Sequence, residues 1–529
     1  MHRLWNRLGR LGLCSVLLAV SALIRPSTSR ADDTSNIPPV HKRDEQERLR
    51  KRIAEAMSGK RDITTPHSQT LVGPDLSERE KVMHVLDRLS FGAKPGEVDE
   101  ILKNGGWQAW VKTQMDPDHV DDATADRVIP QKFPWTKKDI EQLKKEYNGK
   151  ENQSEIKQLK TELAAMVVTR AVISNRQFKE MICDFWRNHF CVDDPGVYEK
   201  TRSWTDADYE QNVIRKYAFS KFGEMLFASA RHPAMLEYLD NKLSYKNNWN
   251  ENYAREVMEL HTLSVDRGYN NLDVQELSKA LTGWTYDSNF KFVFKTEESQ
   301  PGIKYWMGQK LPEGFEGGTQ ALRTLATHPF TAEFISLKLC RYLVNDNPPQ
   351  ALVQKVASVF KQTQGDLPKV YMAIIESPEF MSRENYRSKF KTPLQFVVSS
   401  LRATQAQVND ASYATEVLRK MGEPVYDCPD PTGYFDTAER WMDAGVLTTR
   451  WQFAWDLTRG SADGITIPPA YIDRYKSLKP EEAEQKLIED LLEGEVGDRE
   501  LAALKDVAST GDIPRMMAIV LGSPSFQQR

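Results

Sequence analysis

Residues 137–190 hold a single glycine and no proline, and this stretch constrains the fold more than any other. Lys, Glu, Gln, Leu and Ala dominate it, and all of these residues favour an α-helix. Because glycine and proline are the usual breaks in helical patterns, we expect two long helices, separated near "YNGKENQ" at residues 147–153. The second, residues 154–190, becomes more apolar toward its end, which predicts one continuous helix that enters the core.

Helical signals continue through most of the remaining chain. Ser77 and Glu80 form a capping-box pattern ahead of apolar residues at helical spacing, so the folded body is expected to begin there. Strand-type alternation is clear only in "FKFVFKT", residues 290–296, which we expect to pair with "IKYWMG", residues 303–308. The predicted fold class is therefore mainly α, a multi-helix globular body with at most a small β-hairpin near residues 290–308.

The first residues have the pattern of a secretory signal peptide. Arg3, Arg7 and Arg10 precede an apolar run of 14 residues, 11–24, and a small-x-small site ends at Ala31. The run is shorter than the roughly 20 apolar residues that a membrane span needs. We therefore expect export to the periplasm or the extracellular space, with cleavage near Ala31 and no membrane span in the mature chain.

The mature chain would be acidic. Loss of residues 1–31 removes five arginines and no acidic residue, which leaves 66 Lys and Arg against 75 Asp and Glu. A nucleic-acid partner is therefore not expected. Four cysteines without C-x-x-C spacing predict buried apolar thiols in place of a zinc site or a disulfide scaffold, and they are Cys183, Cys191, Cys340 and Cys428.

Several motifs in order, from about residue 80 to 460, resemble a known bacterial family. They include "HVLDRLSFGAKPGEVDEIL", "FWRNHF", "RHPAMLEYLDN", "NENYAREVMELHTLSVDRGY", "HPFTAEFISLKLCRYLV", "KTPLQFVVSSLRA" and "PDPTGYFDTAERW". Together they resemble the family called domain of unknown function 1800. The resemblance implies an exported, largely helical protein, often encoded beside a sulfatase-like partner family of unknown function 1501. It implies no established reaction, and the cofactor is unknown.

This chain departs from the family pattern at three positions. Ser299 and Gln300 stand where the resemblance implies a His-Asp pair, and Gln395 stands where it implies glutamate. Any role that those groups have in relatives is therefore in doubt here.

The composition divides the chain into four parts. Residues 1–31 are the expected signal peptide, and residues 32–76 are a polar lead with one charged helix. Residues 77–460 form the helical body that resembles the family, and residues 461–529 are expected to be a C-terminal helical extension.

The stretch "NENYAREVMELHTLSVDRGY", residues 250–269, gathers candidate site residues. As a helix with Asn250 as N-cap, it places Glu251, Arg255 and Glu259 on one face, while His261 lies on the opposite, apolar side. This face is either a solvated ladder of ion pairs or the wall of a cleft in which Arg255 is buried, and we expect the buried case. The candidate catalytic residues are Glu251, Glu256, Glu259 and Asp240, and the candidate substrate-binding residues are Arg187, His189, His232, Asn250, Asn252, Arg255 and His261.

The residue types limit the chemistry. The chain has no H-E-x-x-H, and His261 points about 140° away from Glu256 on the helix, so we predict no metal site. It has no G-x-S-x-G. A carboxylate pair in unequal environments needs only the acidic residues present. We therefore expect a hydrolase or lyase that acts on an extracellular polymer, with a non-catalytic binding or assembly protein beside a sulfatase-like partner as the alternative.

Overall fold

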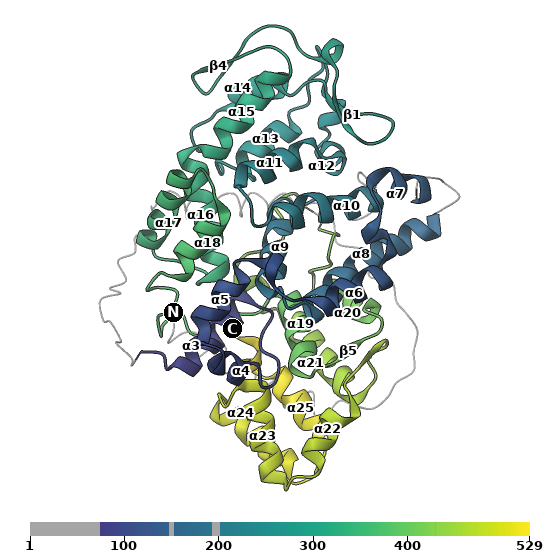
Figure 1. Ribbon diagram of the computed structural model, residues 1–529, viewed down its shortest axis with the longest axis vertical. Coiled ribbons are helices and arrows are strands. Elements are labelled where there is room, and N and C mark those ends of the chain that lie inside the picture. Colours follow the sequence, from purple (N-terminus) through teal and green to yellow (C-terminus); the bar gives the residue numbers. More distant parts are fainter. Residues whose placement is uncertain (1–74, 148–152, 193–201, 429) are drawn as a thin grey trace. The chain divides into compact units, whose positions relative to one another are not determined.

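Helices follow one another along most of the chain, joined by turns and a few short strands (Figure 1). The computed structural model describes residues 75–147, 153–192, 202–428 and 430–529. The expected signal peptide and nearly all of the polar lead lie outside these residues. The described residues belong to one unit of the chain, Ile53–Arg529, and they confirm the mainly α class.

The helices have the following bounds. The first third of the body contains α3 (Glu78–Leu89), α4 (Glu97–Lys103), α5 (Gly106–Gln114), α6 (Ala123–Lys132), α7 (Ile140–Tyr147), α8 (Gln153–Ile173) and α9 (Gln177–His189). The middle contains α10 (Ser203–Tyr209), the π-helix η4 (Glu210–Arg215), α11 (Phe222–Arg231), α12 (Pro233–Tyr238), α13 (Asn252–Glu259), α14 (Asn271–Ala280), α15 (Phe315–Thr327) and α16 (Pro329–Leu343). The remainder contains α17 (Gln350–Thr363), α18 (Leu367–Ile375), α19 (Pro393–Ala403), α20 (Ser412–Lys420), α21 (Ala444–Arg459), α22 (Pro469–Lys476), α23 (Pro480–Leu492), α24 (Asp498–Ala508), α25 (Ile513–Gly522) and α26 (Pro524–Gln527). Short 3₁₀ turns are η1 (Pro117–His119), η2 (Pro134–Lys137), η5 (Asn241–Leu243), η6 (Thr296–Glu298) and η7 (Ala438–Arg440).

The strands form small antiparallel pairs, and one predicted pairing is wrong. The pairs are β1 (Trp284–Tyr286) with β2 (Phe292–Phe294), β3 (Lys304–Trp306) with β4 (Gln309–Leu311), and β5 (Gln407–Val408) with β6 (Ile465–Thr466). The segments expected to pair with each other each pair with a nearer neighbour instead. Tight turns explain this, since Asp287 Oδ1 accepts the N–H groups of Asn289 and Lys291 at 2.8 and 3.0 Å.

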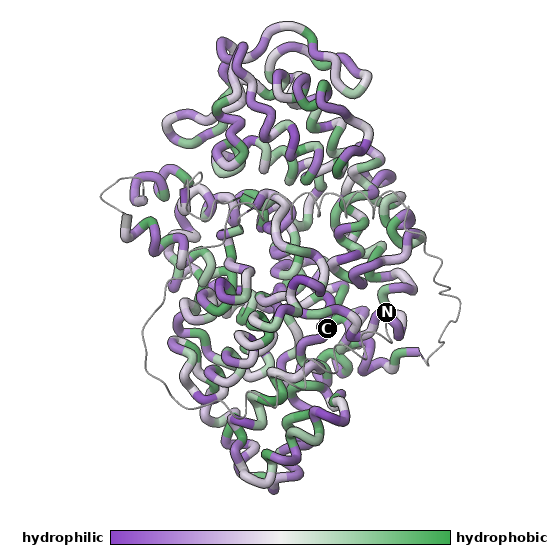
Figure 2. Tube along the Cα trace, turned by 180° about the vertical axis from the view of Figure 1, so that it is seen from behind, coloured by the Kyte–Doolittle hydropathy of each residue, from purple (hydrophilic) through white to green (hydrophobic). Residues whose placement is uncertain are grey.

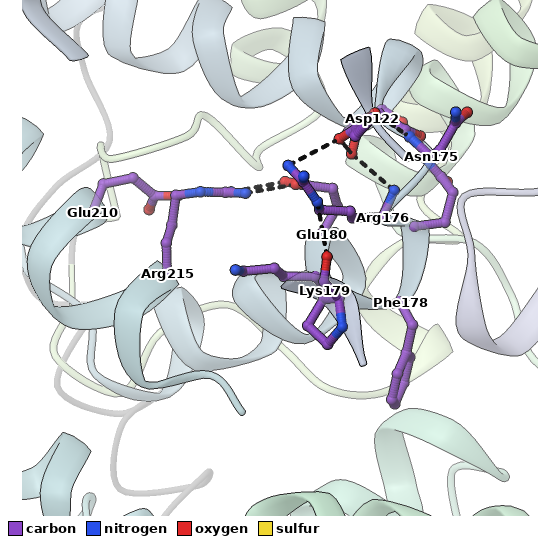
Figure 3. Close-up of polar contacts among 12 residues, drawn as sticks. Asp122, Asn175, Arg176, Phe178, Lys179, Glu180, Glu210 and Arg215 are labelled. Carbon is purple, nitrogen blue, oxygen red and sulfur yellow. Dashed lines mark hydrogen bonds and ion pairs between the residues drawn. The ribbon is translucent and has the colours of Figure 1, made fainter. Parts of the chain in front are cut away.

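The predicted continuous helix of residues 154–190 is also wrong, because it is two helices, α8 and α9. Asp122 stabilises the break between them: its Oδ2 accepts from Ser174 Oγ at 2.6 Å, and its Oδ1 accepts from Asn175 N–H at 2.7 Å (Figure 3). A side-chain acceptor that takes a backbone N–H competes with the helical hydrogen bond to a carbonyl. The chain therefore restarts its helix at Gln177.

The predicted capping box at Ser77 and Glu80 is confirmed. Ser77 Oγ accepts from Glu80 N–H, and the Glu80 carboxylate accepts from Ser77 N–H at 2.7 Å, which completes the capping box of α3. One large hydrophobic core includes buried residues from Val85 to Phe526, and a smaller cluster lies between α3 and α4. Figure 2 shows hydrophobic and hydrophilic residues alternating along the helices, as expected when each helix packs one side into a core.

Two packing features position the pocket described below. Helix α25 packs on α21, and Phe390 forms a β-bridge with Gln528, which fixes the segment that leads into α19. Helix α9 packs against the π-helix η4.

Among the helices of the described ranges, none combines the length and hydropathy that crossing a membrane requires.

Candidate functional site

One pocket forms where α9, the start of α19 and the connection between α20 and α21 meet. Its cavity volume is about 60 Å³, and it opens to solvent at its mouth. Aromatic rings make much of its wall, from Phe185, Tyr342, Phe390, Tyr426, Tyr434, Phe435 and Trp441. Its charged lining consists of Asp184, Arg187, Asp346, Lys389, Glu423, Asp436 and Arg529. Rings around a few convergent charged groups are typical of a ligand site.

The Asp184 carboxyl group lies in this pocket and comes from the middle of α9. Its Oδ2 accepts from Tyr342 OH at 3.0 Å, and its Oδ1 accepts a longer bond from Arg187 Nη1 at 3.3 Å. Burial raises the pKa of Asp184 above its ordinary value, although the Arg187 charge opposes the shift. Asp184 can therefore exchange a proton at a higher pH than an ordinary aspartate.

Glu210 accepts two of the hydrogen bonds that the Arg187 guanidinium donates. Arg187 Nε and Nη2 donate to Glu210 Oε2 and Oε1, both at 3.0 Å, and Tyr426 OH donates to Glu210 Oε2 at 2.7 Å. Burial alone would raise the pKa of Glu210, but Arg187, Arg215 and Tyr426 together outweigh burial, and the pKa lies below its ordinary value. Arg187 thus stabilises the negative charge of Glu210 more than that of Asp184.

A second buried pair extends this network away from the pocket. Arg215 Nη1 and Nη2 donate to Glu180 Oε2 and Oε1 at 2.8 and 2.6 Å, and Arg215 Nη1 lies 3.6 Å from Glu210 Oε1 (Figure 3). Glu180, Asp184 and Arg187 lie on one face of α9, because residues spaced by four and three positions share a helix face. Glu210 and Arg215 both come from η4, and such π-turns occur often at functional sites.

Glu423 reaches the pocket from the chain that follows α20. Its Oε2 accepts the Leu394 N–H at 2.7 Å, at the N-terminus of α19. Burial raises the pKa of Glu423 to about 8, and the Asp184 carboxylate adds to the shift. Glu423 therefore keeps its proton at neutral pH while a second carboxyl group lies within electrostatic reach.

Lys389 supplies a buried cation to the same pocket. Its Nζ bonds to Asp346 Oδ1, and Asp346 Oδ2 accepts the Ala438 N–H at 2.9 Å. Burial lowers the pKa of Lys389 to about 8, while Asp346 opposes the shift. Gln395 also lines the pocket, where its buried amide lies within hydrogen-bonding reach of the Tyr342 hydroxyl. Its Nε2 is a donor that a ligand in the pocket could use.

Asn188, near the end of α9, forms hydrogen bonds to the loop that contains Gly433 and Tyr434. Its Oδ1 accepts from Tyr434 N–H at 2.6 Å, and its Nδ2 donates to Tyr434 O at 3.1 Å. Gly433 has a φ of 74°, and a Cβ there would lie 2.4 Å from the Asn188 backbone oxygen. Only glycine fits this approach, which holds Tyr434 and Phe435 in the pocket wall.

The stretch of residues 250–269 contains a helix, α13, but Arg255 is not buried. Arg255 Nη2 donates to Glu251 Oε2 at 3.0 Å, and the two side chains are 34% and 35% exposed. The expected burial is therefore wrong, because this pair projects from the side of α13 that does not pack into the core. The N-cap also differs: it is Glu251, while Asn250 Oδ1 accepts from Asn252 N–H at 2.9 Å.

Two further candidates contribute to chain turns near α13. Asp240 adopts a φ of 59°, and Asn252 Nδ2 lies 3.5 Å from its Oδ2. His232 caps α12, since its Nδ1 accepts from Ala234 N–H at 3.2 Å, which leaves Nε2 to donate to Asp208 Oδ2 at 2.9 Å. These contacts account for His232 without a ligand.

The remaining candidates are buried in a different part of the core. Glu256 and Glu259 are both 6% exposed. His189 Nε2 donates to the His261 carbonyl at 3.1 Å, and the two rings lie 6.1 Å apart. His261 lies on the apolar side, as predicted, and burial lowers its pKa to about 3. Its ring is therefore neutral at ordinary pH.

The structure brings one sequence-predicted candidate, Arg187, into the pocket. Sequence reasoning missed Asp184, Glu423 and Lys389, although Asp184 and Lys389 lie within two positions of a motif that carried the family resemblance and Glu423 lies six positions before another. The departure at Gln395 was a further signal for this region, since Gln395 lines the pocket. Within the described part of the chain, no three His, Cys, Asp or Glu side chains are grouped to hold a metal ion. The four predicted buried cysteines are all buried.

Comparison with known proteins identifies the family but no activity. No curated protein and no solved structure matches the chain. The family model described as protein of unknown function (DUF1800) matches residues 84–528, which is most of the chain. The chain therefore belongs to the DUF1800 family.

Proposed function

We propose that the protein is a hydrolase or lyase that cleaves an extracellular polymer with the Asp184 and Glu423 carboxyl groups. One observation carries the proposal: two carboxyl groups with raised pKa values line one pocket, and the charge of one raises the pKa of the other. Paired acids in unequal environments are the usual means by which enzymes combine a proton donor and a proton acceptor at neutral pH.

Each carboxyl group takes a distinct role. Glu423 is protonated at neutral pH and donates its proton to the leaving oxygen as the bond to the polymer breaks. Asp184 acts in its ionised form and accepts a proton, either from the attacking water of a hydrolase or from the substrate carbon of a lyase. The proton balance closes in both cases, because one group loses a proton and the other gains one.

The other lining residues suit binding. Arg187 and Tyr342 orient the Asp184 carboxyl group through their hydrogen bonds to its two oxygens. Lys389 offers a cation, and the Gln395 amide offers a donor to a polar substrate group. The rings of Tyr434 and Phe435, with their neighbours in the wall, offer apolar faces against which a substrate unit can stack.

The test is a cleavage screen on soluble polysaccharides and esters that measures new reducing ends, unsaturated ends and released acid. We expect Asp184→Asn and Glu423→Gln each to lower the rate at least about 10²-fold. The matched control variants are Glu251→Gln and Glu256→Gln, which change acids on α13 and should retain the parent rate. Equal rates for the parent and both pocket variants, or a loss confined to the α13 variants, would contradict the proposal.

Export is part of the proposal and rests on the pattern of residues 1–31. N-terminal sequencing of the mature protein should begin just after Ala31, and recovery of the uncut chain in the membrane fraction would contradict this. The alternative function, a non-catalytic assembly protein with a sulfatase-like partner, predicts the opposite result in the cleavage screen. Substitutions at Asp184 and Glu423 would then leave co-purification of that partner unchanged.

A further inference from the structure

Gln395 lies in the first turn of α19, and its side-chain amide is held in one orientation. Its Oε1 accepts the Thr392 N–H at 3.1 Å, and Thr392 Oγ1 accepts the Gln395 N–H at 3.4 Å, which completes a capping box. A backbone N–H needs an acceptor, so the amide oxygen of Gln395 faces Thr392 and the amide nitrogen faces the other way. Gln395 is 2% exposed, so water does not compete for its amide.

The amide nitrogen of Gln395 faces the hydroxyl group of Tyr342. Both side chains line the pocket, and the amide lies within hydrogen-bonding reach of that hydroxyl. An amide nitrogen can donate but cannot accept, so it uses a lone pair of the Tyr342 oxygen. The single hydroxyl proton of Tyr342 is thereby left for the other neighbours of this oxygen.

Two other neighbours of the Tyr342 hydroxyl are acceptors. Tyr342 OH donates to Asp184 Oδ2 at 3.0 Å and to the Met181 carbonyl at 3.1 Å. A hydrogen bond to an ionised carboxylate is roughly twice as strong as one between neutral groups. The hydroxyl proton therefore lies toward Asp184 whenever Asp184 is ionised.

We propose that Gln395 is a positioning residue whose amide directs the Tyr342 hydroxyl proton to the Asp184 carboxylate. The chain of hydrogen bonds from Gln395 through Tyr342 stabilises the ionised form of Asp184. That form accepts a proton in the proposed reaction, so the catalytic meaning of Gln395 rests on the proposed function. The direction of the hydrogen bonds is independent of any reaction.

Other charges act on Asp184 besides this chain of hydrogen bonds. Arg187 and Arg529 favour its ionised form, whereas Glu210 opposes it. Glu423 is also within electrostatic reach, but burial raises its pKa to about 8, so Glu423 keeps its proton in acidic solution. A substitution in the first turn of α19 alters none of these groups. Its effect on Asp184 therefore reports the hydrogen-bond chain.

Gln395→Glu reverses the donor at this position. The variant keeps an oxygen for the Thr392 N–H, but its second carboxylate oxygen competes for the Tyr342 hydroxyl proton. We expect the pKa of Asp184 to rise by at least about one pH unit, because Asp184 loses a donor and gains a negative neighbour. Gln362→Glu is the matched control, since it adds the same charge at an exposed position of α17 and should leave that pKa unchanged.

The pKa of Asp184 can be measured in the whole protein without the reaction. Urea unfolding of each variant, with and without Asp184→Asn, gives the stability that Asp184 contributes between about pH 4 and pH 7. Because the folded pKa is raised, this contribution is complete below the unfolded value of about 3.9 and falls as pH rises toward the folded value. The pH at which the difference becomes constant marks the folded pKa of Asp184.

Tyr342→Phe decides whether Gln395 acts through the tyrosine. Without the hydroxyl group, Gln395→Glu should raise the pKa of Asp184 by less than half of its effect in the parent. An unchanged pKa in Gln395→Glu, or an equal rise with and without the Tyr342 hydroxyl, would overturn the proposal.

Gln395→Met keeps the test decisive if Gln395→Glu does not fold. Methionine has a similar length but no amide, so it removes the donor to Tyr342 without adding a charge. Hydrogen bonds in a chain strengthen one another, so the pKa of Asp184 should rise in the same direction by a smaller amount. An unchanged pKa in a folded Gln395→Met protein would also overturn the proposal.

The cleavage screen separates this role of Gln395 from the proposed function. The acid limb of kcat/KM should move to higher pH in Gln395→Glu together with the pKa of Asp184, and stay in place in Gln362→Glu. A shifted pKa in a protein that cleaves no polymer would contradict the proposed function but support the role of Gln395. Cleavage by the parent, with neither the pKa nor the acid limb shifted in Gln395→Glu, would contradict the role of Gln395 alone.

Discussion

Arg187 and Glu210 form a two-bond ion pair in the interior, with both N···O distances at 3.0 Å and the Glu210 side chain fully buried. The pair comes from α9 and η4, so it joins the helix that carries Asp184 to a π-helical turn. Because Glu210 occupies two of the Arg187 nitrogens, Asp184 receives only the longer bond at 3.3 Å. The raised pKa of Asp184 follows from its burial together with this partial neutralisation.

Substitution of Glu210 should show how much of the free energy of unfolding depends on this ion pair. Glu210→Gln leaves the buried Arg187 without its main counter-charge, so we expect a loss of about 3–5 kcal/mol in the free energy of unfolding. Urea unfolding followed by circular dichroism measures this loss. Glu251→Gln, which breaks a half-exposed pair, is the control and should cost under about 1 kcal/mol. Equal costs for the two variants would show that burial does not distinguish these pairs.

Arg255→Ala tests directly whether the ion pair on α13 is exposed. The Arg255 side chain is 34% exposed and makes one i,i+4 ion pair, so its removal should cost well under about 1 kcal/mol. Arg215→Ala is the matched comparison, since Arg215 makes two bonds to buried Glu180 and should cost about 3–5 kcal/mol. A melting temperature for Arg255→Ala as low as that for Arg215→Ala would mean that Arg255 is buried after all.

The pH dependence of stability should report Glu423. Its pKa is about 8 in the folded chain and about 4.3 when unfolded. The folded state therefore holds a proton that the unfolded state has lost between these values, so this group's contribution to stability is complete below about pH 4 and is lost as pH rises through 8. The slope reaches at most about 1.4 kcal/mol per pH unit.

Glu423→Gln should remove that slope, because glutamine does not titrate. Urea unfolding of the parent and the variant at pH 5, 6, 7 and 8 measures the difference, with the exposed Glu313→Gln as control. Parallel stability curves for the parent and Glu423→Gln across this range would show that Glu423 titrates normally. Glu423 could then not serve as the proton donor of the proposed reaction.

The sequence predicted the class of the fold and much of its local structure for identifiable reasons. The capping box at Ser77 and the burial of His261 depend on residues near in sequence, and both predictions are confirmed. The break between α8 and α9 was missed because it depends on Asp122, which lies 52 positions before Ser174 in the chain. Local propensity carries no information on such a partner.

The pocket was missed for the same reason. Asp184, Lys389 and Glu423 come from three segments that are more than two hundred positions apart at the extremes, and no spacing rule links them. The charges of residues 250–269 are close in sequence, but closeness in sequence is equally a property of an ordinary surface ladder of ion pairs. The helix face on which a charge lies could be predicted, whereas the element that packs on that face could not.

Gly433→Ala should disturb the pocket with little change in its charged residues. A methyl group there would lie 2.4 Å from the Asn188 backbone oxygen, and the φ of 74° is itself strained for any residue with a Cβ. The loop must therefore move, which would break the two hydrogen bonds between Asn188 and Tyr434. We expect a loss of about 1–3 kcal/mol in stability.

Gly302→Ala is the control, because it has a similar φ of 85° but no atom within 4 Å of the added Cβ. Quenching of tryptophan fluorescence by acrylamide should increase in Gly433→Ala, because Trp441 lines the pocket, and remain unchanged in Gly302→Ala. An unchanged quenching constant in both variants would show that the Asn188 contact does not hold the pocket wall.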